Sequence, residues 1–218
     1  MSYKGVIFDL DGTLLDTIAD LGNCMNSVLE RLGLPTHGLD KYKYFVGDGL
    51  LELTRRALGE HLGRDESLVQ NVIQAQREEY GRRWAESTVP YDGIEPMLRE
   101  LGRRGMKLAV LTNKPDDFTH LVMQRFLPAF SFDAVLGAKP ELRLKPDPAG
   151  AIQIARQLDI QPQQFLYLGD TNTDMLCANA AGMYAVGVLW GFRQADELLA
   201  HGAKALLKRP GDVLELLG

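Results

Sequence analysis

From about residue 92 onward, short apolar runs alternate with helical patterns, and this order restricts the possible fold more than any other feature of the sequence. The runs that predict buried strands are 107–111, 133–136, 165–168 and 184–188. The segments with helical spacing are 94–104, 116–126, 148–158 and 172–181. Alternation of this kind predicts an α/β fold, with a mainly parallel sheet covered by helices on both faces, followed by two short C-terminal helices.

An earlier apolar run, 4–8, predicts a first strand, but the pattern after it changes. Apolar residues recur at helical spacing over 18–32, and helical patterns continue over 50–58 and 67–83 with no convincing strand between them. We therefore expect residues 16–88 to form an inserted all-α cap domain, and residues 1–15 and 89–218 to form the core domain. The two joints between these domains, 15–17 and 89–93, are expected hinges.

Two aspartates, Asp9 and Asp11, stand where the first predicted strand breaks into Asp-Leu-Asp-Gly-Thr. Residues two apart in a strand point the same way, so both carboxylates leave its carboxyl end together. That end is where open α/β sheets bind ligands. Two like charges so close call for a cation or a shared proton. An acidic surface turn would not need this order of residues after a buried strand, and we interpret the pair as part of a site.

Polar residues also follow two other predicted strands. Thr112-Asn113-Lys114 follows the run 107–111, and Asp170 and Asp174 follow the run 165–168. Lys145 stands in Lys-Pro-Asp-Pro before a helical segment. An ordinary turn, a surface loop and a helix N-terminus would explain most of these residues one by one. They do not explain an aspartate that follows a glycine at the end of a buried strand, as Asp170 does.

In this order and at these strand ends, the four motifs resemble those of the haloacid dehalogenase-like (HAD) superfamily of phosphotransferases, over the whole chain. The resemblance implies a Rossmann-like three-layer core with an inserted helical cap of type 1. It implies that Asp9 is the nucleophile that forms an aspartyl-phosphate and that Asp11 is the general acid and then the general base. Lys145 would balance the charge on the phosphate and on Asp9.

The resemblance also implies a metal and a phosphate site. Asp9, the backbone carbonyl of Asp11, Asp170 and, directly or through water, Asp174 would hold Mg²⁺, which prefers oxygen ligands. The hydroxyl of Thr112 and the backbone amide of Asn113 would hold phosphoryl oxygens. Lys114 is expected to be peripheral.

Within the predicted cap, Gly47-Asp48-Gly49 lies in a stretch that resembles phosphoglycolate phosphatase-like members of the superfamily, in which this loop helps to select the substrate. Two glycines permit a close approach of the backbone to a small anion. A helix N-terminal turn explains the same residues equally well. The basic residues nearby (Lys41, Lys43, Arg55 and Arg56) could contact a substrate anion or form a solvated face.

The expected activity is Mg²⁺-dependent hydrolysis of a small phosphate monoester, phosphoglycolate-like, through an aspartyl-phosphate. A sugar-phosphate mutase or other phosphotransferase, or a pyrophosphatase, would use the same catalytic residues. A non-catalytic phosphometabolite-binding protein is disfavoured because degenerate members usually lose part of the motif set. Dehalogenation and phosphonate cleavage are disfavoured because those relatives have no aspartate at the position of Asp11.

Composition narrows the expected partners. A net charge of −5 argues against a general nucleic-acid binder. The residues before the first strand show no signal pattern, and no apolar stretch is long enough to span a bilayer. The two cysteines, Cys24 and Cys177, are expected to be buried thiols. We expect a cytoplasmic protein that binds a small phosphorylated metabolite and neither nucleic acid nor membrane, as a monomer or a homodimer.

Overall fold

The computed structural model describes residues 2–217, and the chain divides into two compact units. One unit, here called the sheet unit, comprises residues 1–16 and 90–218. The other, here called the helical unit, comprises Thr17–Val89. The helical unit is therefore an insertion into the sequence of the sheet unit.

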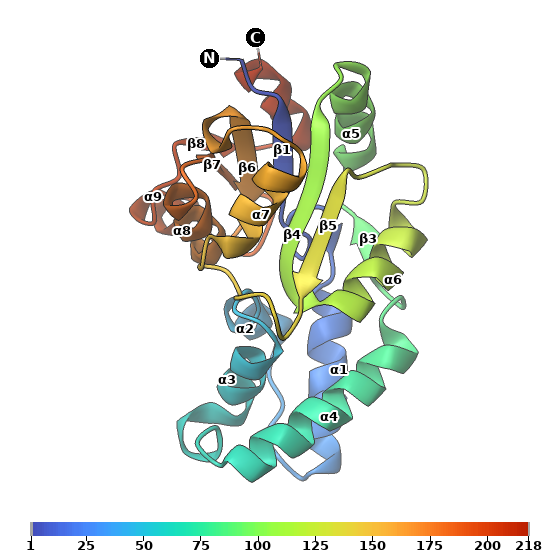
Figure 1. Ribbon diagram of the computed structural model, residues 1–218. Helices are drawn as coiled ribbons and strands as arrows, with labels where there is room; N and C mark the ends of the chain where they lie inside the picture. Colours follow the sequence, from blue (N-terminus) through green and yellow to red (C-terminus); the bar gives the residue numbers. More distant parts are fainter. Residues whose placement is uncertain (1, 218) are drawn as a thin grey trace. The chain divides into compact units, whose positions relative to one another are not determined.

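The sheet unit contains a parallel sheet of six strands within the described residues, in the order β5-β4-β1-β6-β7-β8 (Figure 1). These strands are β1 (Gly5–Phe8), β4 (Lys107–Pro115), β5 (Ala134–Ala138), β6 (Phe165–Gly169), β7 (Tyr184–Val188) and β8 (Ala205–Leu207). Strand β1 lies between β4 and β6, with Val6 opposite Leu108 on one side and Leu166 on the other. The predicted fold class, a mainly parallel α/β sheet with a Rossmann-like arrangement, is confirmed.

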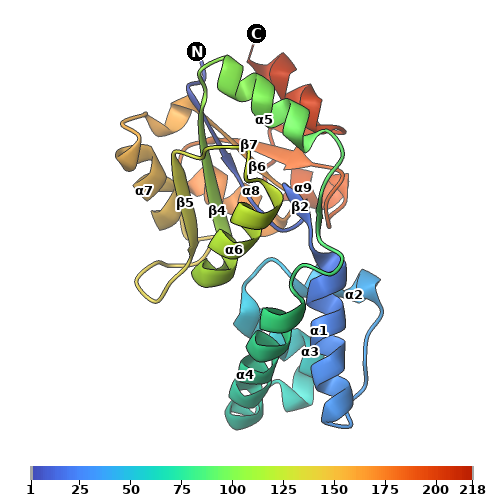
Figure 2. The same cartoon turned by 90° about the vertical axis from the view of Figure 1, so that its right-hand side faces the viewer.

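Helices cover both faces of this sheet. The remaining elements of the unit are α5 (Ile94–Arg103), α6 (Asp116–Phe126), α7 (Ala149–Gln157), η1 (Pro162–Gln164), α8 (Asn172–Ala180), α9 (Ala195–Ala200) and η2 (Pro210–Leu216). Alternate strand residues such as Ile7 and Tyr167 pack into one buried cluster with apolar residues of α7, α8 and α9. Helices α5 and η2 pack on each other, on the opposite side of the sheet from α7 (Figure 2). Burial on both faces explains why the central strands read as continuous apolar runs.

The helical unit is built from α1 (Ile18–Arg31), α2 (Leu39–Phe45), α3 (Leu50–Leu62) and α4 (Glu66–Arg83). Helix α1 packs on α4 and α2, and α3 packs on α4. Met25 and Leu29 of α1 and Val69 and Val72 of α4 are buried and have the helical spacing that buries one face. Two short strands, β2 (Leu15–Asp16) and β3 (Val89–Pro90), form a separate two-stranded sheet.

The elements that were not predicted include the short strands β2 and β3 and the 3₁₀ helix η1. Helix α2 was not predicted, because Tyr42 is its only buried residue and a single apolar contact leaves no periodic signal. At the C-terminal end the structure has α9, the three-residue strand β8 and the 3₁₀ helix η2, where two helices were expected. A strand as short as β8 carries too few residues for its alternation to be recognised.

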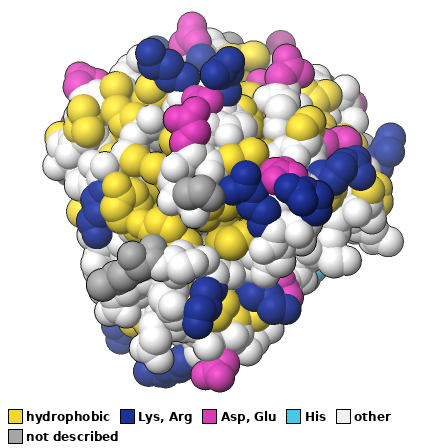
Figure 3. All heavy atoms as spheres, turned by 90° about the horizontal axis from the view of Figure 1, so that it is seen from above, with side chains coloured by type: hydrophobic (Ala, Val, Ile, Leu, Met, Phe, Trp, Pro, Cys, Tyr) yellow, Lys and Arg dark blue, Asp and Glu magenta, His cyan; other side chains and the backbone are white. Residues whose placement is uncertain are grey.

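The buried cysteines and the mixed surface of the described residues are typical of an ordinary globular protein. Cys24 and Cys177 are buried free thiols, as predicted. Among residues 2–217, no helix has the length and apolar character needed to cross a membrane. On the face shown in Figure 3, Lys and Arg side chains lie interspersed with Asp, Glu and hydrophobic side chains.

A buried acid stabilises the helical unit. The carboxylate of Glu79 on α4 accepts hydrogen bonds from Arg31 of α1 at 2.8 Å and from Arg82 and Arg83 of its own helix at 2.9 and 3.2 Å. The hydrogen bond from Arg31, followed by that from Arg82, lowers the pKa of Glu79 to about 2. The charged form of Glu79 therefore stabilises the contact between the first and last helices of the unit.

We predict that Glu79→Gln lowers the free energy of unfolding by about 1–2 kcal/mol, because the arginines lose a charged acceptor. The exposed neighbour Glu78 provides the matched control, and Glu78→Gln should change little. The pKa of Glu79 is depressed in the folded state, so its contribution is present above about pH 4.5 and is lost as the pH falls toward 2. Denaturant unfolding at neutral and acidic pH measures this difference, and equal losses for the two variants would contradict the assignment.

Candidate active site

The candidate site lies at the carboxyl ends of three neighbouring strands of the sheet unit. Asp9 follows β1, Thr112 and Asn113 lie near the end of β4, and Asp170 follows β6. Because β4 and β6 both pair with β1 in parallel, their carboxyl ends lie at the same edge of the sheet. Asp174 joins this edge from the first turn of α8. The sheet thus gathers side chains that are up to 165 positions apart in the sequence, from Asp9 to Asp174.

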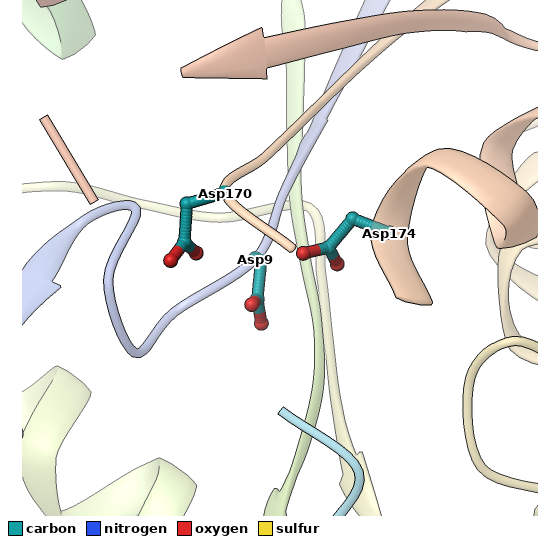
Figure 4. A group of neighbouring side chains, drawn as sticks. All are labelled: Asp9, Asp170 and Asp174. Atoms are coloured by element: carbon teal, nitrogen blue, oxygen red, sulfur yellow. The ribbon is translucent and has the colours of Figure 1, made fainter. Parts of the chain in front are cut away.

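Three buried aspartates form the acidic centre of the site, and we call Asp9, Asp170 and Asp174 the acidic trio. One carboxylate oxygen of each lies within 4.8 Å of those of the other two (Figure 4). Burial, followed by the charge of Asp174, raises the pKa of Asp9 to about 7. Burial and the charge of Asp9 raise the pKa of Asp170 well above its usual range. Like charges confined in this way favour a bound cation, and three carboxylates fit the oxygen preference of Mg²⁺.

Lys145 is the ammonium group of this centre. Its Nζ lies 2.8 Å from Asp9 Oδ1 and 2.7 Å from Asp174 Oδ1, and it donates to the backbone carbonyl of Leu111 at 3.1 Å. Burial alone lowers the pKa of this lysine, but the charges of Asp174 and Asp9 outweigh burial and hold the pKa above its ordinary value. Lys145 therefore stays positively charged and offsets part of the repulsion within the acidic trio.

Asn113 fixes the position of Lys145. Its side-chain amide donates to the Lys145 carbonyl at 3.0 Å, and the Lys145 amide donates to Asn113 Oδ1 at 2.8 Å. This pair of bonds joins the end of β4 to the loop before α7. The sequence pointed to Asn113 for its backbone amide and missed this use of the side chain, since the partner lies 32 positions away.

Asp170 is oriented by two loops. Thr13 Oγ1 donates to Asp170 Oδ1 at 2.9 Å, and the Phe192 amide donates to Oδ2 at 2.8 Å. A Cβ atom at Gly12 or at Gly191 would meet Asp170, so both loops approach it more closely than a side chain permits. The contribution of Gly191 and Phe192 was not predicted, and the only sequence signal for it is a glycine shortly after a buried strand.

Asp174 has two structural roles at once. Its Oδ2 accepts from the backbone amide and the hydroxyl of Thr171 at 3.1 and 2.7 Å, as part of the capping box of α8. Its Oδ1 pairs with Lys145. Helix capping, which was the ordinary explanation of this acid, is therefore present, and it holds the side chain beside Asp9 and Asp170.

The expectation that Lys114 is peripheral was wrong. Its Nζ lies 3.0 and 3.2 Å from the two carboxylate oxygens of Asp11. The Lys114 side chain is 2% exposed and that of Asp11 is 11% exposed. The second aspartate of the motif thus has its own ammonium partner, whereas Asp9 is paired with Lys145.

The loop Gly47-Asp48-Gly49 lies in the helical unit between α2 and α3. Gly47 and Gly49 have φ values of +124° and +89°, which favour glycine. Arg56 of α3 donates to Asp48 Oδ2 at 2.6 Å and to the carbonyls of Tyr44 and Phe45 at 3.2 and 3.1 Å. Arg56, which could have been a substrate contact, therefore braces this loop within its own unit. The role of the loop in substrate selection stays a prediction.

The fold is a parallel α/β sheet with a cluster of buried carboxylates at its carboxyl edge, and comparison with known proteins gives the family. Residues 6–188 match the model of the haloacid dehalogenase-like hydrolase family. The chain is 34% identical over 205 residues to the phosphoglycolate phosphatase of Pseudomonas putida, covering 93% of this chain and 75% of that protein.

Solved structures agree with this assignment. A predicted phosphoglycolate phosphatase from Haemophilus somnus superimposes with a TM-score of 0.92 at 25% identity, covering 100% of this chain and 99% of the other. A predicted phosphatase from Clostridium acetobutylicum gives a TM-score of 0.87 at 26% identity, covering 99% and 100% of the two chains. The chain belongs to the haloacid dehalogenase-like hydrolase family. It is an enzyme of the phosphatase class, as predicted.

We predict that Mg²⁺ raises the melting temperature more at about pH 8 than at about pH 5. The pKa of Asp9 in the cation-free protein, about 7, lies above its unfolded value of 3.8. The native state therefore holds an extra proton between these values, and the stability of the cation-free protein falls as the pH rises through them. A cation replaces that proton, so its stabilising effect grows over the same interval.

Thermal unfolding with and without Mg²⁺ at the two pH values measures this effect. Asp170→Asn should lose most of the Mg²⁺-induced shift, whereas Asp40→Asn, at an exposed carboxylate of the helical unit, should retain it. A shift that is the same at both pH values, or that persists in Asp170→Asn, would contradict a cation site at the acidic trio.

Proposed function

We propose that the protein is a Mg²⁺-dependent phosphatase that hydrolyses a small phosphate monoester through an aspartyl-phosphate on Asp9. One observation carries this proposal: the buried Asp9 carboxylate is paired with Lys145 at 2.8 Å and lies within the acidic trio. Phosphoryl transfer needs a nucleophile in line with the leaving oxygen, a proton donor, and positive charge around the transferred group. The described site contains residues suited to each of these tasks.

Asp9, Asp170, Asp174 and the backbone carbonyl of Asp11 would hold the metal. When bound, Mg²⁺ supplies positive charge that neutralises the phosphoryl oxygens and the surrounding carboxylates. The raised pKa values of Asp9 and Asp170, caused by burial and by the neighbouring carboxylates, support this choice of ligands. With the cation and Lys145 present, Asp9 stays ionised and is able to attack.

In the first step, Asp9 attacks the phosphorus atom and the bond from phosphorus to the ester oxygen breaks. Oδ1 of Asp9 already accepts from the Leu10 amide at 2.7 Å and is paired with Lys145, so we assign the attack to Oδ2. Asp11 gives its proton to the departing alcohol oxygen. In the second step, Asp11 takes a proton from a water molecule that attacks phosphorus, and the Asp9–phosphorus bond breaks to release phosphate and regenerate both side chains.

Thr112, Asn113 and Lys145 would bind the transferred phosphoryl group. The Thr112 hydroxyl and the Asn113 backbone amide lie at the end of β4, next to the strand that carries Asp9. Lys145 would balance charge on the phosphoryl oxygens as well as on Asp9. These groups are held by β4 and by the Asn113–Lys145 hydrogen bonds, so little reorganisation is needed when substrate binds.

For the substrate, we propose a small phosphate ester that resembles phosphoglycolate, and the relatives named as phosphoglycolate phosphatases support this class.

Residues 16–88 would serve as a cap with Gly47, Asp48 and Gly49 facing the substrate, and the joints at 15–17 and 89–93 would be its hinges. Closure of such a cap would exclude water during the first step. We also propose that the protein is cytoplasmic. Its two buried free thiols support this location, because the cytoplasm is a reducing compartment.

The decisive experiment measures phosphate release from a panel of esters with and without Mg²⁺. The panel contains phosphoglycolate, hexose phosphates, nucleotides and pyrophosphate. Metal-dependent release with a strong preference for a small ester supports the proposal. Preference for pyrophosphate would identify a pyrophosphatase, and transfer from a sugar bisphosphate to a second sugar phosphate would identify a mutase. Binding without turnover in the presence of Mg²⁺ would indicate a phosphometabolite-binding protein.

We predict that Asp9→Asn lowers turnover by at least about 10³-fold, because an amide cannot form the aspartyl-phosphate. Asp196→Asn, at an exposed residue in the first turn of α9, is the control and should retain activity within about tenfold. Steady-state phosphate release is the measurement, with the thermal unfolding transition in the absence of Mg²⁺ as the check on folding. Substantial activity in Asp9→Asn would remove Asp9 as the nucleophile.

We predict that Gly49→Ala lowers kcat/KM for the preferred ester by about tenfold or more, through strain in the substrate-facing loop. Gly59→Ala is the matched control, because Gly59 also has a positive φ, +77°, but lies at the kink within α3 with no atom near the added methyl group. Both glycines also have an extended ψ, 174° at Gly49 and 172° at Gly59, in a region that only glycine adopts readily, so both variants should lose about 1–3 kcal/mol of stability. If kcat/KM falls equally in the two variants, the loop has no special role in substrate selection.

A further inference from the structure

We propose that Lys114 is a positioning residue of the reaction, which holds the Asp11 carboxylate apart from the acidic trio while its own backbone amide orients the hydroxyl of Thr112. This inference rests on the proposed function, since it concerns how the proton-transfer and phosphate-binding groups of that reaction are prepared. It concerns a lysine that sequence reasoning had placed outside the site.

The first observation is the contact with Asp11. Both carboxylate oxygens of Asp11 accept from the same Nζ atom, at 3.0 and 3.2 Å, so the pair fixes the direction of the carboxylate as well as its distance. Both side chains are largely withdrawn from water. A buried pair of this kind costs desolvation, and removal of one partner leaves the other charge uncompensated.

The second observation is the anchoring of the Lys114 backbone. Its amide donates to Thr112 Oγ1 at 3.2 Å, and its carbonyl accepts from Thr119 Oγ1 of α6 at 3.2 Å. A hydroxyl group has one proton and two acceptor lone pairs. Because one lone pair of Thr112 accepts from the Lys114 amide, the hydroxyl proton is directed elsewhere and is available to a phosphoryl oxygen.

The third observation is the division of charge in the site. Lys145 is shared by Asp9 and Asp174, whereas Lys114 pairs with Asp11. Asp11 stands only two positions after Asp9, and a carboxylate without its own counter-ion would be attracted to a cation held by the acidic trio. Lys114 therefore holds this side chain apart from the acidic trio, in position to serve the leaving oxygen and then the attacking water.

The test compares leaving groups in Lys114→Met and Lys114→Arg. A poor leaving group, such as the alkoxide of phosphoglycolate, needs protonation by Asp11, whereas 4-nitrophenolate departs largely without it. Single-turnover release of the alcohol should fall about 100-fold for the alkyl ester in Lys114→Met and by less than about tenfold for 4-nitrophenyl phosphate. Lys114→Arg, which can still bind both Asp11 oxygens, should recover most of the alkyl-ester rate.

Lys139→Met is the matched control, because Lys139 is half exposed and pairs with Asp116 outside the acidic trio. It should match the wild type on both esters. Equal losses on the two esters in Lys114→Met, a change in KM alone, or no recovery in Lys114→Arg would overturn the inference while leaving the proposed function intact. A wild-type protein that releases no phosphate from any ester would overturn the proposed function and the inference together.

Discussion

The ion pairs of Lys145 are the interaction on which the site depends. Three aspartates are buried at one edge of the sheet, and without positive charge their repulsion would be resolved by protonation. Lys145 supplies one charge by touching both Asp9 and Asp174, and Asn113 holds its backbone in place with two hydrogen bonds. The geometry leaves negative charge in excess of this one lysine, which is why the site suits a divalent cation.

The surrounding loops make this arrangement rigid. Thr13 and the Phe192 amide each bind one oxygen of Asp170, and Thr171 binds Asp174 through the capping box of α8. Each buried carboxylate of the trio thus has hydrogen-bond partners, as buried charges require. The close approach of Gly12 and Gly191 to Asp170 shows that the backbone itself forms part of the wall of the site.

Two lysines serve the two aspartates of the first motif in different ways. Lys145 stands with Asp9 among buried acids, whereas Lys114 pairs with Asp11 at a slightly more exposed position. Chemically identical side chains two positions apart therefore have different environments. Such a difference is what separates a nucleophile from a proton donor in enzymes that use a pair of carboxylates.

The sequence by itself determined the parallel sheet, the order of most of its elements and the strand ends at which the candidate site residues lie. Alternating apolar runs and helical patterns require a sheet buried on both faces, and polar residues placed directly after buried strands must gather at one edge. Asp9 and Asp170 could be selected because an aspartate placed directly after a buried strand is unusual. Thr112 and Lys145 were selected only because the ordered motifs together resemble those of a known family. The helix α2 and the strand β8 were not predicted, because elements this short bury too few residues to show a helical or strand periodicity of apolar residues.

Only the tertiary structure decided which side chains are partners. The pairing of Lys114 with Asp11 spans 103 positions, and the hydrogen bond from Phe192 to Asp170 joins two separate loops. No local pattern marks such contacts, because they depend on which strands lie side by side and on how far each loop turns back over the sheet edge. Residue type and spacing fix the direction of a side chain along its own element, whereas its partner is set by the packing of elements that are distant in the chain.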